Sequence, residues 1–154
     1  MLLIIIGGIG FFTWEDIYLH KFHFKHYHMQ SKVILTTTLC LILLPAVFFF
    51  FQDYGNLSGI HRLLASLFQA VTPRTAGFNT TDLSMLTGAS KAMMILLMLI
   101  GGSPSSTAGG MKTTTFALLL LNVLATFQSC DDVTAFGRRI DASVIKNATT
   151  IAMM

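Results

Sequence analysis

One uninterrupted apolar run, residues 33–51, limits how this chain can fold more than any other feature. It contains 19 residues and no charged side chain. As an α-helix with a rise of about 1.5 Å per residue, the run is about 28 Å long. The hydrocarbon core of a bilayer is about 30 Å thick. The run therefore predicts a membrane-spanning helix, in which we expect Pro45 to introduce a kink.

The composition of the chain agrees with a membrane environment. Charged residues make up only 11% and hydrophobic residues 53%, whereas soluble domains carry about 25% charged residues. Disorder is excluded because disordered chains are poor in apolar residues. The 10 Lys and Arg residues are scattered between apolar runs. Since nucleic-acid binding needs clustered basic residues, we expect no nucleic-acid partner.

The other apolar segments are shorter than a full membrane span. Residues 2–14 are apolar and then meet two acidic residues, and residues 60–73 have helical spacing and end at a proline. Residues 92–100 and 116–127 flank a polar stretch. Short apolar helices of this kind are typical of re-entrant, interfacial or buried elements. The pattern predicts an all-α integral membrane protein, with a spanning helix, a re-entrant segment and a broken helix.

The basic residues also predict the orientation of these segments. Residues 20–32 contain three lysines, and residues 129–146 contain two arginines and one lysine. The link at 52–59 contains neither Lys nor Arg. Because cytoplasmic loops of membrane proteins carry an excess of Lys and Arg, we expect the first two segments inside and the link outside.

Residues 75–79, with the sequence TAGFN, follow the short helix and form the first candidate site. Irregular backbone at membrane depth is tolerated where it lines water or is buried in protein, and its carbonyls can replace the hydration shell of a monovalent cation. Gly77 would let this backbone turn without a Cβ clash. The C-terminal end of the preceding helix favours a cation electrostatically. The alternative is an ordinary external loop after an interfacial helix.

Residues 101–113, with the sequence GGSPSSTAGGMKT, form the second candidate site. Their glycines and proline disfavour helix, and an unwound stretch near the middle of a membrane marks an ion pathway or gate. We expect this loop to be flexible, with the charge of Lys112 toward the pathway. A plain packing kink is the alternative. A nucleotide-binding P-loop is rejected, because Met111 stands where a glycine should precede Lys112.

No set of residues predicts an enzyme or a resident metal. Four of the five histidines lie within 20–32, and His23 and His26 have a spacing that zinc sites use. No Cys, Asp or Glu lies among them, so we interpret this segment as a basic cytoplasmic loop. The two cysteines match no metal or redox motif, and no Ser–His–Asp set or paired-carboxylate site is present. We therefore expect no enzymatic activity.

Two stretches resemble the Trk/Ktr/HKT superfamily of potassium transporters: QAVTPRTAGFNTTDL at 69–83 and IGGSPSSTAGGMKTTTF at 100–116. GGIGF at 7–11 resembles the end of the helix that precedes the family's third repeat, and FGRRI at 136–140 resembles the loop before the fourth. The amino-acid sequences of the two long motifs are more similar to those of the Ktr membrane subunit than to those of Trk proper.

The resemblance implies four helix–pore loop–helix repeats around one pore, each with a filter segment and a central glycine. The implied potassium-binding residues here are Thr75, Ala76, Gly77, Phe78 and Asn79. The implied gate residues are Gly101, Gly102, Ser103, Ser105, Ser106, Thr107, Gly109, Gly110 and Lys112. Ser105 stands where family members usually have glycine, so the conformation of the loop is an open question at this position.

The resemblance also assigns the segments of the chain. We expect the end of the preceding repeat's inner helix (1–19), a basic cytoplasmic loop (20–32), an outer transmembrane helix (33–51), a pore helix and filter (60–82), a broken inner helix with its gate loop (83–128), and a cytoplasmic loop with the start of the next repeat (129–154). One filter segment cannot close a fourfold ring, and both ends look cut. We therefore expect a fragment of a larger pore.

The implied activity is potassium uptake across the bacterial cell (inner) membrane by a multi-pass protein. K+ is the expected ion, Na+ is a second candidate, and a nucleotide would act only through a regulatory partner. The implied partners are the remaining three repeats, a cytoplasmic nucleotide-binding ring and a second copy in a membrane homodimer. The alternatives are a sodium-selective relative and a truncated, non-transporting membrane remnant or assembly protein.

Overall fold

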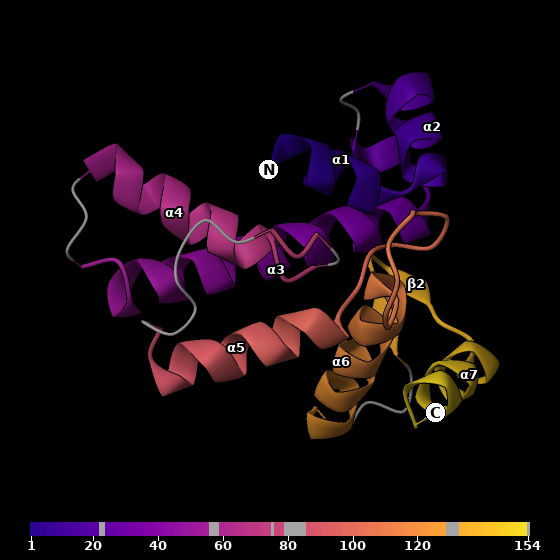
Figure 1. Ribbon diagram of the computed structural model, residues 1–154. Helices are drawn as coiled ribbons and strands as arrows, with labels where there is room; N and C mark the ends of the chain where they lie inside the picture. Colours follow the sequence, from indigo (N-terminus) through magenta and orange to yellow (C-terminus); the bar gives the residue numbers. More distant parts are fainter. Residues whose placement is uncertain (22–23, 56–58, 75, 79–85, 129–132, 154) are drawn as a thin grey trace.

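The computed structural model describes residues 1–21, 24–55, 59–74, 76–78, 86–128 and 133–153. These residues are predominantly helical, which confirms the all-α fold class (Figure 1). The helices are α1 (Leu2–Ile9), α2 (Phe11–His20), the 3-10 turn η1 (Phe24–His26), α3 (Met29–Gln52), α4 (Gly59–Val71), α5 (Gly88–Leu99), α6 (Thr113–Phe127) and α7 (Ala142–Met153). Two short strands, β1 (Thr134–Ala135) and β2 (Arg138–Arg139), pair antiparallel.

Most of the other helices pack on α3, the longest element of the described chain, and α7 packs on α6. It contains the predicted spanning run and begins at Met29, because the polar residues before the run continue the helix. α4 packs along α3, and α5 contacts α3 as well (Figure 1). The core between the three helices is apolar and includes Ala46, Phe49, Ala70, Met94 and Leu97.

Among the described residues, α3 is the single helix long and apolar enough to cross a membrane by itself. α1 and α2 pass the same test as a pair, but they are bent by 92° at their junction. α5 and α6 are apolar helices of 12 and 15 residues, shorter than the roughly 20 residues of a full span. Apolar length is therefore divided among one long helix and several partial ones.

The middle of α4 buries polar side chains and exposes leucines. The polar residues Ser66 and Gln69 are each only 2% exposed, whereas Leu63 and Leu64 are about half exposed. Gln69 donates a hydrogen bond from Nε2 to the sulfur of Met94, at 2.9 Å. Because a soluble bundle buries its leucines and exposes its polar side chains, this arrangement is typical of a helix in apolar surroundings.

The bend between α1 and α2 occurs at Gly10, so residues 1–19 are not one continuous helix. Gly10 has φ +84°, a left-handed conformation that favours glycine. A Cβ at this position would also lie 2.5 Å from the carbonyl oxygen of Pro104. The bend therefore depends both on the missing side chain and on a close contact with a segment far along the chain.

Two carboxylates join helix ends that are distant in sequence. Asp53, after α3, accepts hydrogen bonds from the N–H of Thr87, at 3.1 Å, and from the hydroxyl of Ser90. The N-cap of α5 is Thr87, whose hydroxyl accepts the N–H of Ser90 at 3.3 Å. Asp53 therefore ties this N-cap residue to the end of α3. Buried Asp16 accepts hydrogen bonds in the same way from the N–H of His28, at 3.1 Å, and the hydroxyl of Ser31 at the start of α3.

The segment between α6 and α7 contains a small hairpin within the region expected to be a cytoplasmic loop. Phe136 and Gly137 form its turn, and both have positive φ. Val133, Ala135 and Ile140 are buried beneath it and pack against side chains of α6 and α7. Such two-residue strands carry too little alternation to be recognised from sequence.

Candidate ion pathway

The described part of the predicted filter, residues 76–78, folds back on the end of α4. The helix ends at Val71, and the carbonyl of Thr72 accepts hydrogen bonds from the N–H groups of Ala76 (3.3 Å) and Gly77 (3.0 Å). The hydroxyl of Thr72 donates to the carbonyl of Phe78, at 2.8 Å. Buried Thr72 therefore fixes the segment through both its backbone and its side chain. The filter candidates Thr75 and Asn79 lie outside the described residues.

Gly77 lies at the exposed turn of this segment. Its φ is +69°, and a Cβ built on it would meet no atom within 4 Å. A side chain here would therefore be disfavoured by the left-handed backbone and not by a neighbour. The segment also lies at the C-terminal end of α4, which carries a partial negative charge of about half an electron. This electrostatic environment favours a cation.

The loop between α5 and α6 begins with a short hydrogen-bonded stem. Ile100 and Met111 form a parallel bridge, in which Gly101 N–H donates to the Met111 carbonyl (2.9 Å) and Met111 N–H donates to the Leu99 carbonyl (3.2 Å). Thr113 N–H donates to Gly102 O at 3.1 Å, where α6 starts. The break between α5 and α6 therefore comprises residues 100–112, against 101–113 expected from the sequence.

The loop is bound to the bend between α1 and α2 through Ser103, which is fully buried. Its N–H donates to the Gly8 carbonyl at 3.0 Å, and its hydroxyl contacts the carbonyls of Gly8 (2.9 Å) and Ile9. In the opposite direction, Phe11 N–H donates to the Ser105 carbonyl at 3.4 Å. The sequence predicted a flexible loop, whereas these hydrogen bonds attach the loop to a defined surface, the bend between α1 and α2.

The tip of the loop is ordered by its own side chains. Ser106 donates its hydroxyl to the Ser103 carbonyl at 2.6 Å and accepts the N–H of Ala108 at 3.3 Å. The ammonium of Lys112 donates to the Ala108 carbonyl at 2.8 Å. Lys112 therefore binds the loop itself, where the sequence had suggested a charge directed at the pathway. The remaining gate candidates are buried at Gly101 and Gly102 and exposed at Ser105, Thr107, Gly109 and Gly110.

Ser105 has φ +61°, a conformation uncommon for residues other than glycine. The question raised by the sequence at this position therefore has a physical answer. The backbone adopts the left-handed conformation that a glycine would take, and the serine side chain adds strain of about 1–2 kcal/mol. Ser105 is exposed, so its side chain has room despite this strain.

One direct contact joins the two candidate sites. Arg74, which follows α4, donates from Nη2 to the Gly101 carbonyl at 3.4 Å. The residue that precedes the predicted filter thus touches the stem of the predicted gate. Sequence reasoning singled out neither Arg74 nor Thr72, although both lie in the VTPR stretch immediately before TAGFN. The position of a charged residue between a short apolar helix and the filter was the available signal.

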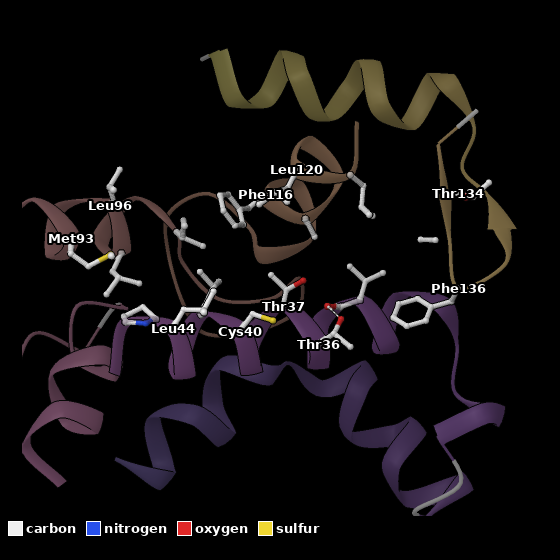
Figure 2. A pocket seen from close by; sticks show the side chains of 18 residues that line it. Thr36, Thr37, Cys40, Leu44, Met93, Leu96, Phe116, Leu120, Thr134 and Phe136 are labelled. Carbon is white, nitrogen blue, oxygen red and sulfur yellow. Dashed lines mark hydrogen bonds between the residues drawn. The ribbon is translucent and has the colours of Figure 1, made fainter. Parts of the chain in front are cut away.

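A large apolar groove of about 620 Å³ is present in the described structure. It lies between α3, α5, α6 and the hairpin, and Figure 2 shows Leu44, Met93, Leu96, Phe116 and Leu120 around it. Thr36 is one of its few polar side chains, and its hydroxyl donates to the Lys32 carbonyl of its own helix at 2.8 Å. Its mostly apolar lining therefore offers few ligands for an ion.

Elsewhere in the part of the chain that the structure describes, no group of three or more His, Cys, Asp or Glu residues is arranged to bind a metal ion. His28 is close to Asp16, with Nδ1 2.6 Å from Oδ1. His20 stacks on His26, with 6.4 Å between ring centroids. His23 lies outside the described residues.

The helical fold, its apolar exposed surface and its broken helices define the class as an all-α membrane protein. A family model described as a cation transport protein, TrkH, matches residues 1–153. The chain belongs to this family of membrane cation transporters, which confirms the family resemblance recognised in the sequence.

Curated relatives agree with this assignment. The Ktr system potassium uptake protein B of Bacillus subtilis (strain 168) is 36% identical over 98% of this chain and 35% of its own length. The potassium/sodium uptake protein NtpJ of Enterococcus hirae is 37% identical over 97% of this chain and 34% of its own length. The chain therefore spans about a third of the length of these curated relatives.

Proposed function

We propose that the chain contributes one helix–re-entrant segment–helix repeat to a potassium-uptake pore in the bacterial inner membrane. The observation that carries the proposal is the junction of the two candidate sites. The short helix α4 ends in a cation-favouring turn, and Arg74 joins this turn to the break between α5 and α6. The names of the relatives, potassium and potassium/sodium uptake proteins, support K+ as the transported ion.

In this proposal, residues 75–79 supply part of the filter. Dehydrated K+ binds backbone carbonyls there, which replace its hydration shell. The negative end of α4 stabilises the ion, and the membrane potential drives uptake. Three further repeats supply the remaining filter segments, and the complete protein is a multi-pass membrane homodimer. The repeat performs no covalent chemistry.

The loop at 101–113 acts as the gate in this proposal. Its bonds to the bend between α1 and α2 support a defined closed position. A cytoplasmic nucleotide-binding ring changes the fraction of pores whose loop is in that closed position. Nucleotide therefore acts on the ring and not on this chain. The basic segments 20–32 and 129–146 lie on the cytoplasmic side, where the ring binds.

Potassium uptake by the complete protein that contains this chain tests the function. A bacterial strain without its own potassium-uptake systems should regain growth at low K+ when it expresses the protein with its ring partner. Rubidium uptake by the same cells gives the rate. If the protein is present in the membrane but does not improve growth at any limiting K+ concentration, the potassium-uptake function is refuted.

Sodium is the second candidate ion, because the name of the Enterococcus hirae relative includes it. Uptake of radioactive Na+ at fixed K+ separates the two possibilities. Uptake of Na+ that K+ fails to inhibit would favour a sodium-selective relative. Absence of both fluxes in a well-expressed protein would favour a non-transporting remnant or assembly protein.

A further inference from the structure

A small buried cavity lies where α1, α3, the segment after α4 and the loop between α5 and α6 meet. Its volume is about 20 Å³. A cavity needs roughly 10–15 Å³, together with two to four polar partners, to hold one water molecule. The lining includes Thr38 of α3, Arg74 and the glycines Gly101 and Gly102.

Thr38 supplies an independent reason for a ligand in this cavity. Its side chain is buried, at 5% exposure, and its hydroxyl has no hydrogen-bond partner among the described residues. A buried hydroxyl without a partner is costly, and buried polar groups in folded proteins are nearly always satisfied by protein or by ordered water. The neighbouring Thr36 differs, because its hydroxyl binds carbonyls of its own helix.

Arg74 occupies the remaining polar position around the cavity and donates to the Gly101 carbonyl at 3.4 Å. The carbonyl of Gly101 lies in the stem that fixes the loop, because the N–H of the same residue donates to Met111. On its other side, Arg74 is two residues from Ala76, which hydrogen-bonds to the end of α4. Movement of the loop stem is therefore transmitted to the filter turn through one side chain.

We propose that Arg74 is a positioning residue that couples the turn at 76–78 to the loop at 100–112, with one water molecule bridging Arg74 and Thr38. This inference rests on the proposed function and adds how the gate and the filter influence each other. The guanidinium holds the loop stem directly. The water ties both to α3, so the filter turn, the gate and the outer helix form one hydrogen-bonded unit.

The test uses the complete protein with its ring partner and two transport readouts. Uptake with and without the ring reports on the loop, and the preference for K+ over Na+ reports on the filter. Arg74→Gln should change both readouts, each by about tenfold, because it removes a charged hydrogen bond shared by the two sites. Arg74→Lys, which keeps the charge but loses the planar fork, should restore only part of each.

Thr38→Val removes the hydroxyl with almost no change in shape. In the wild-type background, Thr38→Val should alter the same two readouts by about threefold. In the Arg74→Gln background, it should cause no additional change. Thr36→Val is the matched control, because that hydroxyl does not face the cavity, and it should leave both readouts unchanged.

Several outcomes would overturn the coupling. The coupling is refuted by a change in only one readout for Arg74→Gln, by equal effects of Thr38→Val and Thr36→Val, or by additive effects of the Arg74 and Thr38 variants. If Arg74→Gln does not reach the membrane, a double-mutant cycle of Arg74→Lys and Thr38→Val tests the coupling instead. If the unmodified protein carries no K+, the proposed function fails, and the same cycle measured as Tm of the purified protein still decides whether Arg74 and Thr38 share a water.

Discussion

Replacement of Ser103 by alanine should loosen the gate, because this serine makes most of the contact between the loop and the bend in α1 and α2. The side chain is fully buried, and its hydroxyl contacts the carbonyls of Gly8 and Ile9. In the variant, the Gly8 carbonyl still accepts a hydrogen bond from the backbone N–H of residue 103. The Ile9 carbonyl loses the hydroxyl that binds it.

The structure allows a magnitude for this change. Loss of one buried hydrogen bond, with an acceptor left unsatisfied, costs about 1–3 kcal/mol. Coupling free energies of that size correspond to population changes of about 5- to 150-fold. If the bound loop is the closed state, the fraction of open pores in the absence of the ring should rise by this factor until it saturates.

The assay is rubidium uptake by cells that express the complete protein, with and without the ring, after membrane expression and Tm have been checked. Ser103→Ala should raise uptake without the ring and leave the maximal rate with the ring nearly unchanged. Ser106→Ala is the control, since its hydroxyl bonds only within the loop, and its effect should be smaller. Normal expression with uptake that is unchanged or reduced would refute the assignment of the bound loop as the closed state.

Gly77→Ser should weaken the preference for K+ over Na+, because a side chain at φ +69° disturbs the filter turn; unchanged uptake affinities for both ions would count against Gly77 as a filter residue. Deletion of residues 103–108 should raise potassium flux and reduce its dependence on the ring, and a well-expressed deletion that transports less would show that the loop is structural or conducting. Ser105→Gly should raise the Tm of the purified protein, since relief of the strain at φ +61° is worth about 1 kcal/mol; a lower Tm would contradict this. A cysteine in place of Asn56, in a protein without its native cysteines, should be labelled from outside intact cells, and labelling only after permeabilisation would reverse the predicted topology.

The sequence predicted the helices well because their causes are local. An uncharged run of 19 residues produces α3, and a proline soon after a short apolar pattern ends α4 at Val71. The break between α5 and α6 follows from its glycines and proline. In a helix interior, each glycine raises the free energy of the helix by about 1 kcal/mol and a proline by about 3 kcal/mol relative to alanine. None of these features needs a contact with a distant residue.

The parts that the sequence left open depend on long-range contacts. The 92° bend at Gly10 is bound to Ser103 and Ser105, which are more than 90 residues away. The hydrogen bonds that Asp53 accepts at the start of α5 join positions 34 and 37 residues apart. The roles of Thr72 and Arg74 depend on which carbonyls lie nearby in space. A single sequence carries no direct record of such contacts.

The two helix breaks of this chain satisfy each other, and this limits how the gate can move. The end of α1 leaves carbonyls without helical partners, and Ser103, in the loop after α5, has an N–H that no helix of its own pairs. In apolar surroundings, each such group costs several kcal/mol if it stays unpaired. Ser103 removes both deficits at once, since its N–H and hydroxyl bind Gly8 and Ile9. A loop that leaves this position must therefore exchange these bonds for water or for new protein donors, so opening of the proposed gate requires one of the two to reach the bend at Gly10.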